Sequence, residues 1–154
     1  MDLYLKRASR DDMNTVWRMQ VEVFTPLLEK YQDHGLSPAQ ESLEDLLKKY
    51  DMPETTYYLI SAEDNIVGAI RVVDRKDGSR KRISPVFIMP EYRNRGYAQK
   101  AILEAERLHG QDNWSLNTIL QEKRNLHLYE KLGYHRTGET LNVNERMDVV
   151  FLEK

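Results

Sequence analysis

The stretch from residue 86 to residue 98 limits the possible folds of this chain more than any other segment. Its first four residues, 86–89, are apolar and predict a buried strand that Pro90 ends. After Gly96, apolar residues recur at the spacing of a helix. A strand that leads through a glycine turn into a helix aims the unpaired N–H groups of that helix at the space before the turn. The arrangement therefore predicts a cradle for an anion such as a phosphate.

The rest of the chain alternates between strand and helix patterns, with no linker, repeat or low-complexity stretch. Strands are predicted over residues 3–8, 55–62, 66–73, 114–120, 134–143 and 147–153, and between the turn at Asp77-Gly78 and Met89. One helix is predicted from Met13, where Ser9 and Asp12 resemble a capping box, and a second from Ser37-Pro38. Pro26 is expected to break or kink the first of these helices.

Two motifs in the second half of the chain resemble one known family. Arg93, Gly96 and Ala98 form the pattern R-x-x-G-x-A. This pattern resembles the R/Q-x-x-G-x-G/A motif of the GCN5-related N-acetyltransferases (GNAT), which binds the pyrophosphate of acetyl-coenzyme A. Residues 128–134 resemble the L-Y-E-K-x-G-F/Y element near the C-terminus of the same family. The order and spacing of the two motifs agree with the family throughout this half of the chain.

The resemblance implies an α/β fold with a mixed seven-stranded sheet, helices on both faces and a single domain over residues 1–154. Pro85 fits this fold, because the fourth strand of the family carries a bulge and diverges from the fifth, and a proline in a strand is tolerated mainly at a bulge or an edge. The diverging strand would pair with the pantetheine arm of the cofactor through the backbone of Val86, Phe87 and Ile88.

The same resemblance implies acetyl-coenzyme A as the acyl donor, without a metal. The residues expected to hold its pyrophosphate are Arg93, Asn94, Arg95, Gly96, Tyr97, Ala98, Gln99 and Lys100. Family members often carry an asparagine seven residues before the tyrosine of the C-terminal element, but this chain has Glu122 there and Asn125 one turn later. Asn125 is therefore a candidate contact to the cofactor. Lys100, Arg107 and Arg124 are candidates for its phosphates or, equally, ordinary surface residues of their helices.

Tyr129 takes the place of the family's tyrosine beside the sulfur of the cofactor. A phenol with a reference pKa of about 10 can protonate the departing thiolate without being ionised itself. The alternative is a core tyrosine, since Leu126, Tyr129 and Leu132 share one helix face. The general base is undetermined, because residues 80–89 contain no carboxylate, and Glu22 and Glu29 are interpreted as solvated helix residues.

Composition restricts the chemistry further. The chain of 154 residues has no cysteine, which excludes an acyl-cysteine intermediate and leaves direct attack by the acceptor. Its 23 lysines and arginines against 25 aspartates and glutamates give a net charge of −2 and no general attraction to nucleic acid or membrane. The basic stretch at residues 75–82 is therefore interpreted as a solvated hairpin. The histidines, His34, His109, His127 and His135, lack metal-ligand spacing and are interpreted as surface or capping residues.

These observations predict an enzyme that transfers an acetyl group to the primary amine of a small molecule or a peptide. A non-catalytic sensor of acyl-coenzyme A, in which Tyr129 is only structural, is the alternative. Residues 24–40 show no code for the acceptor. Neither a signal peptide nor an apolar run of about 20 residues is present, so a cytoplasmic protein is expected. Relatives are often dimers, which makes a homodimer an expectation too.

Overall fold

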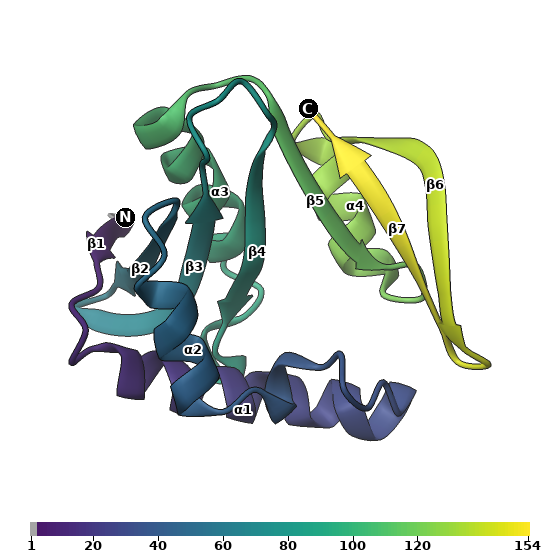
Figure 1. The fold of residues 1–154 in the computed structure, drawn as a ribbon, viewed down its shortest axis with the longest axis horizontal. Coiled ribbons are helices and arrows are strands. Elements are labelled where there is room, and N and C mark those ends of the chain that lie inside the picture. The colour runs from purple at the N-terminus through teal and green to yellow at the C-terminus, as the bar shows by residue number, and fades with distance from the viewer. Residues whose placement is uncertain (1–2) are drawn as a thin grey trace.

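The architecture is seen in a computed structural model that describes residues 3–154. One seven-stranded sheet has the order β1-β2-β3-β4-β5-β7-β6 (Figure 1). The strands are β1 (Leu3–Arg7), β2 (Thr55–Ala62), β3 (Asn65–Val73), β4 (Lys81–Ile88), β5 (Trp114–Ile119), β6 (His135–Asn144) and β7 (Met147–Glu153). The helices are α1 (Met13–Tyr31), α2 (Leu43–Tyr50), α3 (Tyr97–His109) and α4 (Lys123–Lys131), with short 3-10 turns at η1 (Pro38–Gln40) and η2 (Pro90–Tyr92). Only β4 and β5 pair in parallel among the described strands, so the predicted mixed sheet is confirmed.

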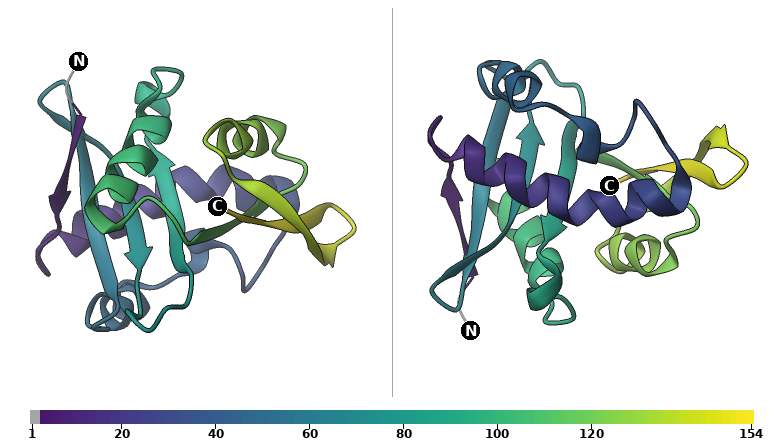
Figure 2. Two further views of the ribbon diagram at one scale, coloured as in Figure 1. Left: turned by 90° about the horizontal axis from the view of Figure 1, so that it is seen from above. Right: turned by 90° about the horizontal axis from the view of Figure 1, so that it is seen from below.

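The sheet separates two hydrophobic cores. One contains apolar residues of α3 and α4, among them Ile102 and Leu126, together with Ile70 of β3 and the fully buried Trp114 of β5. The other packs residues of α1 and α2 against the opposite face, which is the face of Tyr57. Figure 2 shows α2 on one side of the sheet and α3 and α4 on the other. The alternation of side chains along each strand supplies both cores at once.

Two helix boundaries differ from the sequence predictions. The helix expected to start at Ser37 is only the 3-10 turn η1, and α2 begins after Ser42, whose hydroxyl accepts the N–H of Asp45 at 3.1 Å. Of the break or kink expected at Pro26, the break does not occur, because α1 continues past this residue to Tyr31. Pro26 cannot donate to the carbonyl of Glu22, but both residues are exposed, so water can satisfy that carbonyl.

The predicted capping box at the start of α1 is confirmed. The N–H of Asp12 donates to the hydroxyl of Ser9 at 3.2 Å, and the N–H of Ser9 donates to the Asp12 carboxylate at 2.8 Å. The Asp12 N–H also donates to the Ser9 carbonyl at 3.1 Å, whereas the Ser9 N–H has no backbone acceptor among the described residues, so the Asp12 carboxylate is its partner.

A bulge in β4 occurs where Pro85 predicted one. The pairing of β3 with β4 shifts between Ile70 and Val72, so that one residue of β3 faces two of β4 at Ser84 and Pro85. Beyond the bulge, β3 and β4 approach each other closely at Gly68, where an added Cβ would collide with the carbonyl oxygen of Phe87. The bulge therefore bends β4 while its far end stays tightly bound to β3.

A buried carboxylate joins α3 to the end of β7. Glu106 is 0% exposed, and its two oxygens accept the hydroxyl of Tyr134 and the ammonium of Lys154, each at 2.9 Å. A carboxylate without solvent is stable only when its oxygens are paired in this way.

We expect Lys154→Met to lower the free energy of unfolding, because it keeps an apolar stem but leaves the Glu106 carboxylate with Tyr134 alone. Since the Lys154 side chain keeps 24% of its exposure, we expect a loss of about 2 kcal/mol, below the range for fully buried pairs. Urea denaturation at neutral pH measures it. Lys131→Met, at an exposed residue, is the matched control and should change stability by less than about 0.5 kcal/mol. Equal effects of the two variants would contradict this account.

Candidate active site

The end of β4 has an edge that no described strand pairs with. β4 and β5 are paired only at Lys81 with Trp114 and at Arg82 with Ser115, and the two strands then splay apart (Figure 1). On its other side β4 stays paired with β3 as far as Ile88. The Met89 N–H donates to Val67 of β3 at 2.7 Å, which fixes the alternation of the ladder. By that alternation the backbone groups of Val86 and Ile88 point to the unpaired edge.

The turn after β4 delivers a helix with free N–H groups. Asn94 and Gly96 have positive φ values of 64° and 79°, and Gly96 is the N-cap of α3. Lys100 donates its N–H to the Gly96 carbonyl at 3.1 Å, so its amide is already used within the helix. For the amides of Tyr97, Ala98 and Gln99, residues 3–154 offer no backbone acceptor or side-chain cap. These first-turn donors make an anion-binding end on a helix of 13 residues.

Several side chains of this turn are occupied by the protein itself. The Arg93 Nε donates to the Ile88 carbonyl at 3.2 Å. Arg95 forms an ion pair with Glu63 at 2.7 Å, and the hydroxyl of Tyr97 also donates to Glu63. These bonds lower the pKa of Glu63, the bond from Tyr97 contributing most. Around Arg95 and Tyr97, the backbone is therefore better placed than the side chains to meet a ligand.

Tyr129 lies in the same hydrophobic core as Tyr97 and Ala98. The residue is 9% exposed, and its ring meets that of Tyr134 edge to face at a centroid distance of 6.4 Å. Burial raises the pKa of Tyr129 to about 12. No hydrogen bond joins its hydroxyl to any residue in the described part of the chain, in contrast to the hydroxyl of Tyr134, which is held by Glu106. Tyr129 therefore retains a neutral donor that the fold does not use.

The residues that precede Tyr129 on α4 have other partners than the sequence suggested. Glu122, at the position of the family's asparagine, accepts the hydroxyl of Tyr31 and the ammonium of Lys30, the latter at 3.2 Å. Burial alone would raise the pKa of Glu122, but the two bonds together outweigh it and lower the pKa. Asn125 is exposed, and Arg124 donates to the side chain of Asn94 in the turn before α3. The start of α4 is thus bonded to two distant segments.

The C-terminal hairpin holds the end of α1 as well. The side-chain amide of Asn144 donates to the Tyr31 carbonyl at 2.9 Å, and Arg146 donates to the Lys30 carbonyl at 3.3 Å. With the bonds of Glu122, these contacts connect the N-terminal helix to the start of α4 and to the turn between β6 and β7.

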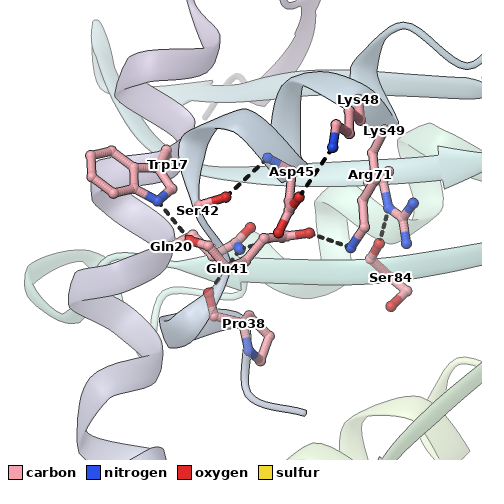
Figure 3. Close-up of polar contacts among 10 residues, drawn as sticks. All are labelled: Trp17, Gln20, Pro38, Glu41, Ser42, Asp45, Lys48, Lys49, Arg71 and Ser84. Carbon is pink, nitrogen blue, oxygen red and sulfur yellow. Dashed lines mark hydrogen bonds and ion pairs between the residues drawn. The ribbon is translucent and has the colours of Figure 1, made fainter. Parts of the chain in front are cut away.

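A polar network that the sequence analysis did not identify lies between α1 and α2 (Figure 3). Glu41 has a side chain only 14% exposed, which accepts from Gln20 at 2.9 Å and pairs with Lys49 at 2.6 Å. Trp17 donates its indole N–H to the Glu41 carbonyl at 2.8 Å. The side-chain oxygen of Gln20 and the hydroxyl of Tyr57 are buried without a partner in the described structure. Gln20 at a core position of α1 is the one signal in the sequence for this network.

The remaining acid and imidazole candidates are mostly at the surface. Glu22 and Glu29 are exposed, in agreement with their interpretation as solvated residues. His109 is an exception among the histidines, because it is half-buried and bonded to the hydroxyl of Tyr58 at 2.7 Å, and burial lowers its pKa. No group of three or more metal-ligating side chains occurs within residues 3–154. In the same part of the chain, no helix is both long and apolar enough to cross a membrane.

Comparisons with solved structures agree with this fold. A spermidine N-acetyltransferase from Vibrio cholerae, solved with CoA and spermine, superimposes with a TM-score of 0.74 at 19% identity and covers 97% of this chain and 93% of its own. The PaiA N-acetyltransferase from Thermoplasma acidophilum, solved with coenzyme A, gives the same TM-score at 15% identity and covers 100% of both chains. At these identities the likeness shows the shared fold.

The sequence comparisons show the family. An uncharacterized N-acetyltransferase, YjgM of Escherichia coli (strain K12), is 26% identical over 121 residues, which are 75% of this chain and 72% of that protein. The profile described as the acetyltransferase (GNAT) family matches residues 19–134, which include α3, its preceding turn and Tyr129. The chain therefore belongs to the acetyltransferase (GNAT) family and is an acetyl-coenzyme A-dependent N-acetyltransferase.

Proposed function

We propose that this enzyme transfers the acetyl group of acetyl-coenzyme A to a primary amine by direct attack, with Tyr129 assisting departure of the thiolate. The observation that supports this most is that three unused groups of donors lie on neighbouring elements. The unpaired edge of β4, the free amides at the start of α3 and the unbonded hydroxyl of Tyr129 belong to consecutive or touching elements. Acetyl-coenzyme A, an extended thioester that ends in a pyrophosphate, carries hydrogen-bond acceptors that match these donors.

In this proposal the donor contacts several residues of β4, the turn and α3. The backbone of Val86 and Ile88 pairs with the pantetheine arm beside Phe87, and the amides of Tyr97, Ala98 and Gln99 bind the pyrophosphate. Asn94, Arg95, Gly96 and Lys100 shape or flank that turn, with Arg93 fixing its start through the Ile88 carbonyl. Asn125 stays a candidate at the exposed start of α4. Among these contacts, the start of α3 is best suited to an anion, because it has three free amides in succession.

The reaction in this proposal needs three proton transfers, after which Tyr129 is reprotonated. The acceptor ammonium first loses a proton, because only the neutral amine can attack the thioester carbonyl. The new C–N bond forms as the C–S bond breaks, and the hydroxyl of Tyr129 supplies a proton to the sulfur. The attacking nitrogen then loses its second proton to water or to a base, and the ionised Tyr129 takes a proton back from water. Glu41 is already bonded to Gln20 and Lys49, so we assign it no such role.

The acceptor is not carried over from the structural neighbours. The Vibrio cholerae enzymes act on spermidine, and one was solved as a dodecamer, but their identity to this chain is below 25%. An amine acceptor of a small molecule or a peptide, a homodimer and a cytoplasmic location remain predictions for this chain.

We expect Gly96→Val to weaken coenzyme A binding by roughly tenfold or more, because the side chain would stand where the phosphates approach the α3 amides. Isothermal titration calorimetry with coenzyme A measures the affinity. The variant also strains a residue with a φ of 79°, so Gly138→Val, at a φ of 93° and likewise in open space on β6, is the matched control. Unchanged affinity in a folded Gly96→Val protein would contradict the site.

Replacing Tyr129 with Phe keeps the ring in its core and removes only the hydroxyl. We expect kcat to fall by about 10²- to 10⁴-fold, the usual contribution of a general acid, while coenzyme A affinity changes little. Release of coenzyme A can be followed with a thiol reagent, since the protein has no cysteine of its own. Tyr134→Phe is the control, because the Tyr134 hydroxyl bonds Glu106 instead. Wild-type turnover in Tyr129→Phe would remove the proposed role.

The pH dependence follows from the two groups that exchange protons. With a pKa of about 12, Tyr129 stays protonated and able to donate across the neutral range. An acceptor ammonium with a reference pKa near 10.4 loses its proton progressively as the pH rises. At low acceptor concentration we therefore expect the rate to increase between about pH 6 and 9. A flat profile would indicate a buried base, and a falling one would contradict the raised pKa of Tyr129.

A further inference from the structure

A pocket lined by arginines lies on the α2 side of the sheet, near the start of β4. Its volume is about 290 Å³, and its charged lining consists of Arg71, Arg75, Arg80, Arg82 and Glu54. The pocket also includes Ser115, which is paired with Arg82 at the junction of β4 and β5. A space of this size accommodates a side-chain-sized group, at the small end of ligand sites.

The pairing between β2 and β3 shows which face of the sheet carries Arg71 and the pocket. Arg71 is directly opposite Tyr57, and the Tyr57 ring stacks on Tyr50 of α2 at a centroid distance of 6.4 Å. Side chains of directly paired residues share a face of the sheet. Arg71 therefore extends toward α2, on the side opposite α3 and α4 (Figure 3).

Most of the positive charge in this pocket has no counter-charge. Arg80 forms an ion pair with Glu153 at 3.0 Å, but Arg71, Arg75 and Arg82 form none with residues 3–154. Glu54 is the one carboxylate of the lining, so the lining carries an excess of positive charge. Desolvation, followed by repulsion from Arg71 and Arg75, lowers the pKa of Arg82. Clustered cations of this kind favour binding of an anion.

The orientation of Arg71 is fixed by the bulge in β4. Its Nε donates to the Ser84 carbonyl, a bond drawn in Figure 3. The other two guanidinium nitrogens have no hydrogen-bond partner in the described structure, and the residue is half-buried. A guanidinium held by one nitrogen presents the others as a preorganised fork for a carboxylate or a phosphate.

The pocket lies along β4 from the proposed donor site. If the pyrophosphate binds at α3, the pantetheine arm runs back along Ile88 and Val86 and brings its thioester toward the bulge at Ser84. Arg82 is two residues farther along the strand from Ser84, which is about 7 Å at 3.3 Å per residue. A molecule whose amine meets the thioester can therefore place a second group in the pocket.

We propose that this pocket binds an anionic group of the acceptor, a carboxylate or a phosphate, so that the preferred acceptors are amines that also carry a negative charge. Arg71 and Arg82 would contact the anion, and Arg75 would add charge from the hairpin. The proposal rests on the proposed acetyl transfer and names its substrate class. It adds a function to the exposed basic stretch at residues 75–82, because three of the pocket's arginines belong to that stretch.

The test compares matched acceptors in one assay of coenzyme A release. The acceptors are ω-amino acids of graded length, their primary amides, the corresponding aminoalkyl phosphates and the corresponding diamines. Comparing the amino acids with the aminoalkyl phosphates shows whether the pocket prefers a carboxylate or a phosphate. The amides remove the negative charge while keeping the length of the acceptor. Each acceptor is measured with the wild type, with Arg75→Gln, with Arg82→Gln and with Arg136→Gln. Arg136 is exposed on β6, away from the pocket, and is the matched loss of charge.

We expect wild-type kcat/KM for at least one anionic series to exceed that for the amides by roughly tenfold or more, as for a charge-assisted hydrogen bond. Arg82→Gln should bring this ratio close to one, Arg75→Gln should reduce it, and Arg136→Gln should preserve it. Comparing ratios between proteins cancels the different basicities of the amines. A ratio that is the same in all four proteins, or a preference for the diamines, would overturn the proposal.

Failure of the proposed function gives a different result. If the wild type acetylates none of these amines, the same acids and phosphates are titrated by calorimetry into the wild type and into Arg82→Gln. Binding that is lost in Arg82→Gln would support an anion pocket without the proposed transfer. An absence of binding to the wild type would overturn the pocket itself.

Discussion

The early end of the pairing between β4 and β5 is the constraint on which the rest of this structure depends. Two residue pairs hold the strands together, after which β4 follows β3 and β5 follows β7. β4 is therefore an interior strand at its start and an edge strand at its end. Unpaired edges are normally covered or blunted, because they attract other strands. Here the edge leads through η2 to the turn at Gly96, so that strand donors and helix donors follow one another along the chain.

The bulge gives β4 different functions on its two sides. Toward α3, the strand continues into a helix start with unsatisfied amides. Toward α2, the extra residue exposes the Ser84 carbonyl, which orients Arg71. Bulges commonly redirect a side chain beside an active site. In this protein one irregularity thus connects the proposed donor site and the arginine pocket through the backbone of the same strand.

Local patterns in the sequence predicted most of the elements, while contacts between distant residues had to come from the structure. The strand, turn and helix around Gly96, the capping box at Ser9 and the bulge at Pro85 depend on neighbouring residues and were correctly predicted. The α2 start was wrong because a Ser-Pro pair fits a 3-10 turn as well as a helix. The partners of Glu122 are 91 and 92 residues away, and Arg71 joins the other arginines only through strand register. No spacing along the chain encodes such contacts.

The length of α1 has a consequence for the whole molecule. Met13 and Val16, at the beginning of α1, pack in the core. The last residues of α1 are held by Glu122, Asn144 and Arg146 from the other half of the sheet. One residue inserted between these ends would lengthen the helix by about 1.5 Å and rotate Tyr31 by about 100°. The two halves of the sheet could not keep both sets of contacts. The number of residues within α1 is therefore constrained by the contacts at both of its ends.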